Sequence, residues 1–189
     1  MKNLMMIFCL LVTAVFIWVW HHQTQFNDNS RKARFHLKNG ELESAVDAYT
    51  KAIRHKKYTL FFTNAPSVYN NLGQVYLQQG KYERAIETFE EVIELKPDAI
   101  QAYINLATTH LKQNEPDQAI ESCQKALWIA PNTALTHYNL ACAYAIKTEN
   151  TEAINALRKA IHLDPRIKEL ANREPVFDVL KSDPRYPAD

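Results

Sequence analysis

A pattern that recurs every 34 residues is the feature that most limits how this chain folds. Residues 66–99, 100–133 and 134–167 align without gaps at that offset. The shared columns are Tyr69/Tyr103/His137, Leu72/Leu106/Leu140, Gly73/Ala107/Ala141, Tyr76/His110/Tyr144, Ala85/Ala119/Ala153 and Pro97/Pro131/Pro165. Spacings of three, four and seven residues place such a set on one face of an α-helix. Each segment is therefore predicted to form two helices, and its proline ends the second because proline cannot continue the hydrogen-bond ladder.

A fourth, weaker copy precedes these three. It matches the columns at Ala33, His36, Gly40, Ala45, Tyr49 and Ala52, and six inserted residues separate it from the next copy. It departs from the pattern at Asn29, Lys32 and Lys57, which replace the ring, the leucine and the proline. The first copy is therefore expected to pack imperfectly at its start.

These residues resemble the tetratricopeptide repeat (TPR) family. The resemblance rests on the period, on Leu-Gly-x-x-Tyr at 72–76, on Ala-x-x-x-Phe at 85–89 and on Pro97, and it covers about residues 26–167. It implies an all-α solenoid of antiparallel helix pairs, three to four repeats long, whose first helices line a concave groove. In this family the groove is the usual ligand surface.

The turns inside the helix pairs fit this expectation. Gly40, Gly80 and Asn114 stand where each first helix must stop, and all three residue types tolerate a left-handed backbone. Thr148 departs from this at the same position in the last repeat, and we expect either strain there, because a β-branched residue disfavours that conformation, or a turn accommodated by Asn150.

The first 20 residues differ from the rest of the chain. Residues 4–20 read LMMIFCLLVTAVFIWVW, with no charge, and a helix of this length spans about 25 Å. Trp18 and Trp20 at its end suit a headgroup layer better than a peptidase site. We therefore expect an uncleaved single-pass anchor, with a cleaved signal peptide as the alternative. The flanking charges nearly balance, and the short positive tail before the helix favours a soluble domain on the non-cytoplasmic side. The alternative is that the basic stretch after the helix lies against anionic headgroups on the cytoplasmic side.

These features divide the chain into six parts. They are a transmembrane anchor (1–21), a juxtamembrane segment with the divergent first repeat and an insertion (22–65), three repeats (66–99, 100–133 and 134–167) and a C-terminal cap (168–189). The cap is expected to be a helix that carries Val176, Phe177, Val179 and Leu180, opened by Glu174-Pro175 and ended by Asp183-Pro184. The insertion carries Tyr58, Leu60, Phe61 and Phe62, which either cover the misfit first repeat or lie in a membrane interface.

Twelve residues of the first helices are predicted to face the groove and bind a partner. They are Asn70, Asn71, Gln74, Gln78, Ile104, Asn105, Thr108, Leu111, Lys112, Tyr138, Asn139 and Ile146. Asn71, Asn105 and Asn139 recur at the repeat spacing. Such amides can hold the backbone of an extended peptide, or they can simply be solvated. The apolar members of the distal repeats predict a protein or peptide ligand with apolar anchors.

Other functions are not expected from this sequence. Glycine occurs only three times in 189 residues, so a phosphate-binding loop is nearly impossible, and no catalytic motif is present. The net charge of +1 gives no basic footprint for nucleic acid. His110, Cys123, His137 and Cys142 lie within 33 residues, but antiparallel packing places the two histidines at opposite ends of the helical layer. We therefore predict no enzyme, no small-molecule substrate, no cofactor and no metal.

The sequence thus favours a non-catalytic adaptor that binds a partner segment and holds it near a membrane, in assembly of a membrane or envelope complex. The alternative is a chaperone-like factor that transiently binds unfolded or translocating chains. Among the known subtypes of the family, binding of heat-shock chaperone tails is not expected. Gln101 and Asn105 stand where that subtype needs basic residues.

Overall fold

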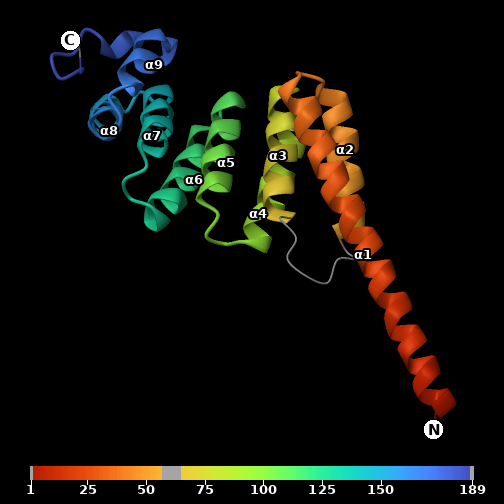
Figure 1. Ribbon diagram of the computed structural model, residues 1–189. Helices are drawn as coiled ribbons and strands as arrows, with labels where there is room; N and C mark the ends of the chain where they lie inside the picture. Colours follow the sequence, from red (N-terminus) through yellow and green to blue (C-terminus); the bar gives the residue numbers. More distant parts are fainter. Residues whose placement is uncertain (1, 57–64, 188–189) are drawn as a thin grey trace. The chain divides into compact units, whose positions relative to one another are not determined.

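A computed structural model describes residues 2–56 and 65–187, and every regular element in these ranges is a helix. The elements are α1 (Lys2–Lys38), α2 (Leu42–Lys56), α3 (Ala65–Gln78), α4 (Tyr82–Leu95), α5 (Ile100–Lys112), α6 (Pro116–Ile129), α7 (Ala134–Ile146), α8 (Asn150–Leu163), α9 (Ile167–Arg173) and the 3₁₀ helix η1 (Pro175–Leu180) (Figure 1). The all-α repeat fold is confirmed. The aromatic residues of the insertion lie outside the described residues.

The helices form two compact units, Met1–Gly80 and Lys81–Asp189, which are described separately. In the first unit, α2 packs against both α1 and α3. In the second unit, each helix from α4 to α8 packs against the next, and α5 also contacts α7. Contacts between successive helices and between alternate first helices are those that a stacked helical repeat requires.

Four turns between paired helices share one backbone conformation. Gly40 and Gly80 have φ of 76° and 71°, and Asn114 and Thr148 have φ of 59° and 61°. The turns at Gly40, Asn114 and Thr148 also repeat a hydrogen bond that reaches back five residues, such as Glu115 N to His110 O and Glu149 N to Tyr144 O, both 2.9 Å. This pair of features is the Schellman ending of a helix, so the left-handed turns predicted from the sequence are confirmed.

Thr148 is the one β-branched residue among these turns, which leads to a prediction. Replacing Thr148 with glycine should raise the free energy of unfolding by about 0.5–1 kcal/mol, because glycine removes the left-handed strain but loses more entropy on folding. Urea denaturation of the full chain in detergent measures this gain. Asn114→Gly is the matched control and should change stability little, because asparagine already tolerates this conformation. A loss of stability in Thr148→Gly would contradict the argument.

In the first unit, the apolar segment and the first repeat share a single helix. α1 runs from Lys2 to Lys38 without a break, so no turn separates the predicted anchor from the juxtamembrane segment (Figure 1). The first repeat is also better packed than expected. Phe26, one turn before the weak Asn29 column, is only 2% exposed and lies in a cluster with Tyr49 and Val68.

The apolar N-terminal part of α1 is exposed in the described structure. Its large apolar side chains from Met5 to Trp20 are exposed apart from the half-buried Val19, and none of the apolar window is buried. Among the described residues, this is the one helix long and apolar enough to cross a membrane by length and composition.

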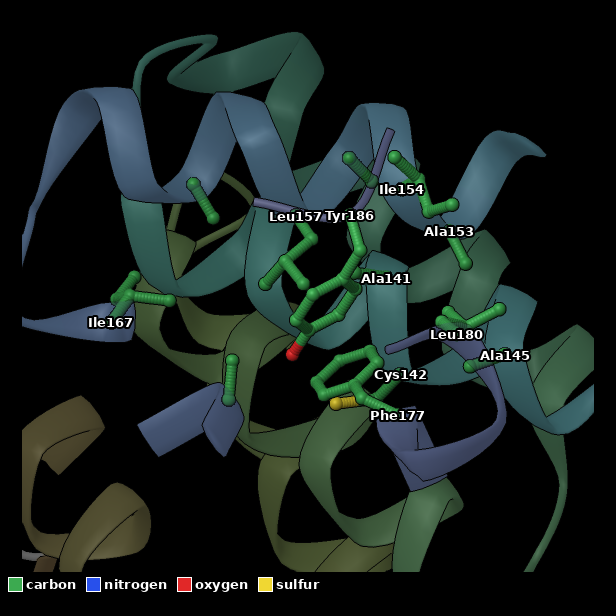
Figure 2. Close-up of a cluster of buried hydrophobic side chains, with 13 residues drawn as sticks. Ala141, Cys142, Ala145, Ala153, Ile154, Leu157, Ile167, Phe177, Leu180 and Tyr186 are labelled. Atoms are coloured by element: carbon green, nitrogen blue, oxygen red, sulfur yellow. The ribbon is translucent and has the colours of Figure 1, made fainter. Parts of the chain in front are cut away.

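The second unit is built around small residues at the helix crossings. Ala107, Ala119, Ala141 and Ala153 are all fully buried, as the sequence columns predict. Their small side chains let α5 approach α6 and α7 approach α8 closely. One cluster of larger core residues lies at the C-terminal end, where Leu157 of α8 lies among α7, α9 and η1 (Figure 2).

The C-terminal cap differs from the single helix expected. Its first part is the short helix α9, and Glu174 then leaves the helical conformation with ψ of 113°. The expected helix after Pro175 is a 3₁₀ helix instead. Phe177 and Leu180 are buried as predicted, but Val179 is 69% exposed, so its assignment to the apolar face is wrong. A 3₁₀ helix has three residues per turn, which places residues 177 and 180, but not 179, on one face.

Candidate functional site

A pocket of about 180 Å³ opens between α5, α7 and the segment that follows α9. Its lining residues are Thr108, Leu111, Lys112, Tyr138, Asn139, Cys142, Ile146, Glu174 and Val176. The first helices of two successive repeats therefore supply most of its wall, as expected of a groove between first helices.

The helical period explains which side chains meet there. On α5, Thr108 and Leu111 are three residues apart and lie on one face, and the next residue, Lys112, lies at the edge of that face. On α7, Tyr138, Cys142 and Ile146 follow each other at intervals of four. The resulting surface combines apolar side chains with a lysine at the exposed edge.

Asn139 is fixed inside this wall. It is only 4% exposed, and its Nδ2 donates to Thr108 Oγ1 at 3.0 Å and to the Ile104 carbonyl oxygen at 3.4 Å. Both bonds connect α7 to α5. Asn105 is also buried, at 7% exposure, and its Oδ1 accepts a bond from Gln101 Nε2 at 3.0 Å. In this unit the asparagine ladder is therefore buried and internally bonded, which differs from both the open and the solvated alternatives.

The C-terminal segment completes the pocket. Glu174 and Val176 line it, while Phe177 packs edge-on against the Tyr138 ring at a centroid distance of 5.9 Å. Burial raises the pKa of the Tyr138 hydroxyl, and the nearby Cys142 and Glu174 add to the shift. Burial also raises the pKa of the Cys142 thiol to about 12, so this thiol stays protonated and unreactive at neutral pH. The pocket therefore presents neutral Tyr and Cys side chains to a ligand.

The structure brings together half of the predicted groove residues. Thr108, Leu111, Lys112, Tyr138, Asn139 and Ile146 line this one pocket. Ile104 and Asn105 are buried and do not line it. Asn70, Asn71, Gln74 and Gln78 lie on α3, which belongs to the other unit. Sequence reasoning missed Glu174 and Val176, because the cap has no repeat column that would reveal which side chains face the groove.

The four candidate metal ligands do not gather. His110 Nδ1 lies 2.8 Å from Glu115 Oε2, and His137 Nε2 donates to the Pro131 carbonyl oxygen at 2.9 Å. Cys123 is fully buried, and desolvation raises its pKa to about 12. Across residues 2–56 and 65–187, no group of three or more His, Cys, Asp or Glu side chains is placed to hold a metal ion.

Stacked helix pairs with a lined groove between their first helices define a helical-repeat protein of the solenoid class. Residues 28–98 and 64–130 match a profile of the tetratricopeptide repeat family, and residues 134–167 match a second profile of the same description. The chain therefore belongs to the tetratricopeptide repeat family, and the resemblance found in its sequence is confirmed. No curated protein matches the sequence closely enough to count as a relative.

Several solved structures share the fold. The fragment of MamA from residue 41 to the end, from Desulfovibrio magneticus RS-1, has a TM-score of 0.71 at 24% identity, covering 84% of this chain and 86% of that one. TTC0263, a thermophilic TPR protein of Thermus thermophilus, has a TM-score of 0.66 at 18% identity, covering 82% of each chain. YrrB, a TPR protein with an unusual peptide-binding site, has a TM-score of 0.60 at 20% identity, covering 81% of this chain and 76% of that one. At these identities the likeness shows the fold alone.

Proposed function

We propose that this protein is a non-catalytic adaptor that binds a segment of a partner protein in its groove and holds it near a membrane, in assembly of a membrane or envelope complex. The observation that carries the proposal is the pocket between α5, α7 and the C-terminal segment. TPR proteins are in general interaction modules, and YrrB, which shares this fold, has a peptide-binding site.

The chemistry of the pocket suits a peptide with an apolar anchor. Leu111, Ile146 and Val176 offer apolar surface, while the buried bonds of Asn139 hold the floor rigid. A pre-formed pocket lowers the entropy lost on binding. Lys112, exposed at the edge, adds a donor for a carbonyl or carboxylate of the ligand.

The membrane part of the proposal depends on α1. In water its exposed apolar segment would be far larger than the patches that soluble proteins tolerate. Trp18 and Trp20 end that segment, where tryptophan suits the headgroup layer. We therefore propose an uncleaved single-pass anchor, with the repeats on the non-cytoplasmic side. An epitope tag at each end, probed by protease in intact cells, would test both retention of the segment and its orientation.

Photo-crosslinking in cells tests the groove. A photoreactive amino acid at Thr108 should give one dominant adduct, and the same amino acid at Lys159, exposed on the second helix α8, should not. Tyr138→Ala should reduce the Thr108 adduct at least fivefold, because it removes one apolar wall. An unchanged adduct in Tyr138→Ala would overturn the groove assignment. A ladder of many weak adducts would instead support the chaperone-like alternative and overturn the adaptor.

A further inference from the structure

A second pocket, of about 230 Å³, lies in the first unit between α1 and the start of α3. It is lined by Phe26, Asn27, Ser30, Arg31, Arg34 and Val68. At the 40-residue offset of the first copy, Arg31 and Arg34 stand at the columns of the predicted groove residues Asn71 and Gln74. The pocket therefore continues that face into the first repeat, and the inference drawn from it rests on the proposed function. We propose that this pocket binds an acidic segment of a partner protein, with the guanidinium groups of Arg31 and Arg34 pairing with its carboxylates.

Most of the available hydrogen-bonding groups that line the pocket are donors. Ser30 already donates its hydroxyl to the Phe26 carbonyl oxygen at 2.7 Å. Asn27 accepts a bond at Oδ1 from Gln23, which leaves its two Nδ2 hydrogens available. Arg31 and Arg34 can only donate, and no carboxylate lines the pocket. An acceptor-rich ligand is therefore the chemical complement of this wall.

The protein itself neutralises the two arginines only in part. Arg31 reaches only the exposed Asp28, at 3.7 Å, and Arg34 forms no ion pair or hydrogen bond within the described part of the chain. Residues 1–80 contain nine Lys and Arg against four Asp and Glu. The three other acids have partners elsewhere: Glu41 contacts His36, Glu43 accepts a bond from Gln79, and Asp47 pairs with Lys51.

The donor side chains of this surface also recur at helical spacing. Asn27, Arg31, Arg34 and Lys38 follow each other at intervals of four, three and four, which places them on one face of α1. Arg31 and Arg34 are about 4.5 Å apart along the helix axis. Carboxylates on neighbouring turns of a peptide can meet two such groups, and a guanidinium binds a carboxylate in a bidentate fork.

A protein ligand fits the position of the pocket better than a lipid headgroup. Arg31 lies eleven residues beyond Trp20 on the same unbroken helix, which is about 16 Å of rise. The polar layer on each side of a bilayer is only about 5–8 Å thick. If the apolar segment spans the membrane, as proposed above, both arginines stand outside the headgroup layer.

Peptide binding to the full chain in nonionic detergent tests the proposal. The probe is a fluorescein-labelled peptide of Glu-Glu-Leu repeats, and the matched peptide has Gln at every Glu. Fluorescence anisotropy should show at least tenfold weaker binding of the Gln peptide. The double variant Arg31→Gln/Arg34→Gln should weaken binding of the Glu peptide at least tenfold. Lys32→Gln/Arg54→Gln removes the same charge from exposed positions outside the pocket and should change binding less than twofold.

Three results would overturn the proposal. Equal binding of the two peptides would show that carboxylates are not recognised. An equal loss in both double variants would show that only the overall charge of the unit matters. In nanodiscs, displacement of the peptide by phosphatidylglycerol, dependent on Arg31 and Arg34, would assign the pocket to lipid. Thermal melts followed by circular dichroism establish that the variants fold. The Thr108 adduct serves as a separate readout of the groove, so failure of one site is distinguishable from failure of the other.

Discussion

Replacing Phe177 with alanine is expected to lower the free energy of unfolding by about 3–5 kcal/mol. The Phe177 side chain is completely buried and lies beside Cys142 in the core of the second unit (Figure 2). Its ring also packs edge-on against Tyr138, an arrangement worth about 0.5–1.5 kcal/mol beyond burial alone. Truncation loses the apolar transfer energy and leaves a cavity that the surrounding helices fill only partly.

The same 3₁₀ helix provides the control. Val179 is 69% exposed, so Val179→Ala should change stability by less than about 0.5 kcal/mol. Urea denaturation followed by circular dichroism measures both variants, and limited proteolysis reports release of the C-terminal segment. Equal effects of the two substitutions would contradict the assigned packing of the cap. Release of this segment should also remove Glu174 and Val176 from the pocket, so the Thr108 adduct should weaken in Phe177→Ala.

The repeats were predictable because their signals are local and recur. Each helix pair contacts its neighbours, so the spacing of Leu106 and Ala107 within one repeat already indicates which face is buried. Three turns follow from residue types that tolerate a left-handed backbone, as at Asn114, whereas Thr148 adopts the same conformation because of its place in the repeat. In a fold stabilised by contacts between neighbouring repeats, the structure of each repeat depends little on distant parts of the sequence.

The parts that sequence could not resolve lie where the repeat pattern stops. Phe26 packs the first repeat from one turn outside the expected column, so the pattern at Asn29 and Lys32 gave no sign of it. The cap has one copy only, and its 3₁₀ period is not visible in so short a segment. The recurrence of asparagine at the repeat spacing also does not show which groups these side chains bond to. The hydrogen bonds of Asn139 to α5 depend on how the two helices pack.

Those bonds predict a large effect of a small chemical change. Asn139→Asp should lower the free energy of unfolding by about 3 kcal/mol at neutral pH, because it places a charge in a buried site. It also removes the Nδ2 group that donates hydrogen bonds to Thr108 Oγ1 and to the Ile104 carbonyl oxygen. The carbonyl oxygen cannot donate in return, so the introduced carboxylate faces a repelling group. Asn155→Asp, on an exposed position of α8, is the matched control and should cost less than about 0.5 kcal/mol.

The pH dependence distinguishes buried charge from a general loss of packing. Burial raises the pKa of the introduced carboxyl in the folded state above its unfolded value of about 3.9. The folded variant therefore holds its proton to higher pH than the unfolded chain does, and the cost relative to the unsubstituted protein grows as pH rises through the folded-state pKa. Urea denaturation in detergent should thus show a smaller difference at pH 4.5 than at pH 7 for Asn139→Asp. A small difference that is equal at both pH values would show that the site is solvated, and the side chain at 139 would then be free to meet a ligand directly. A large difference that is equal at both pH values would show a general loss of packing.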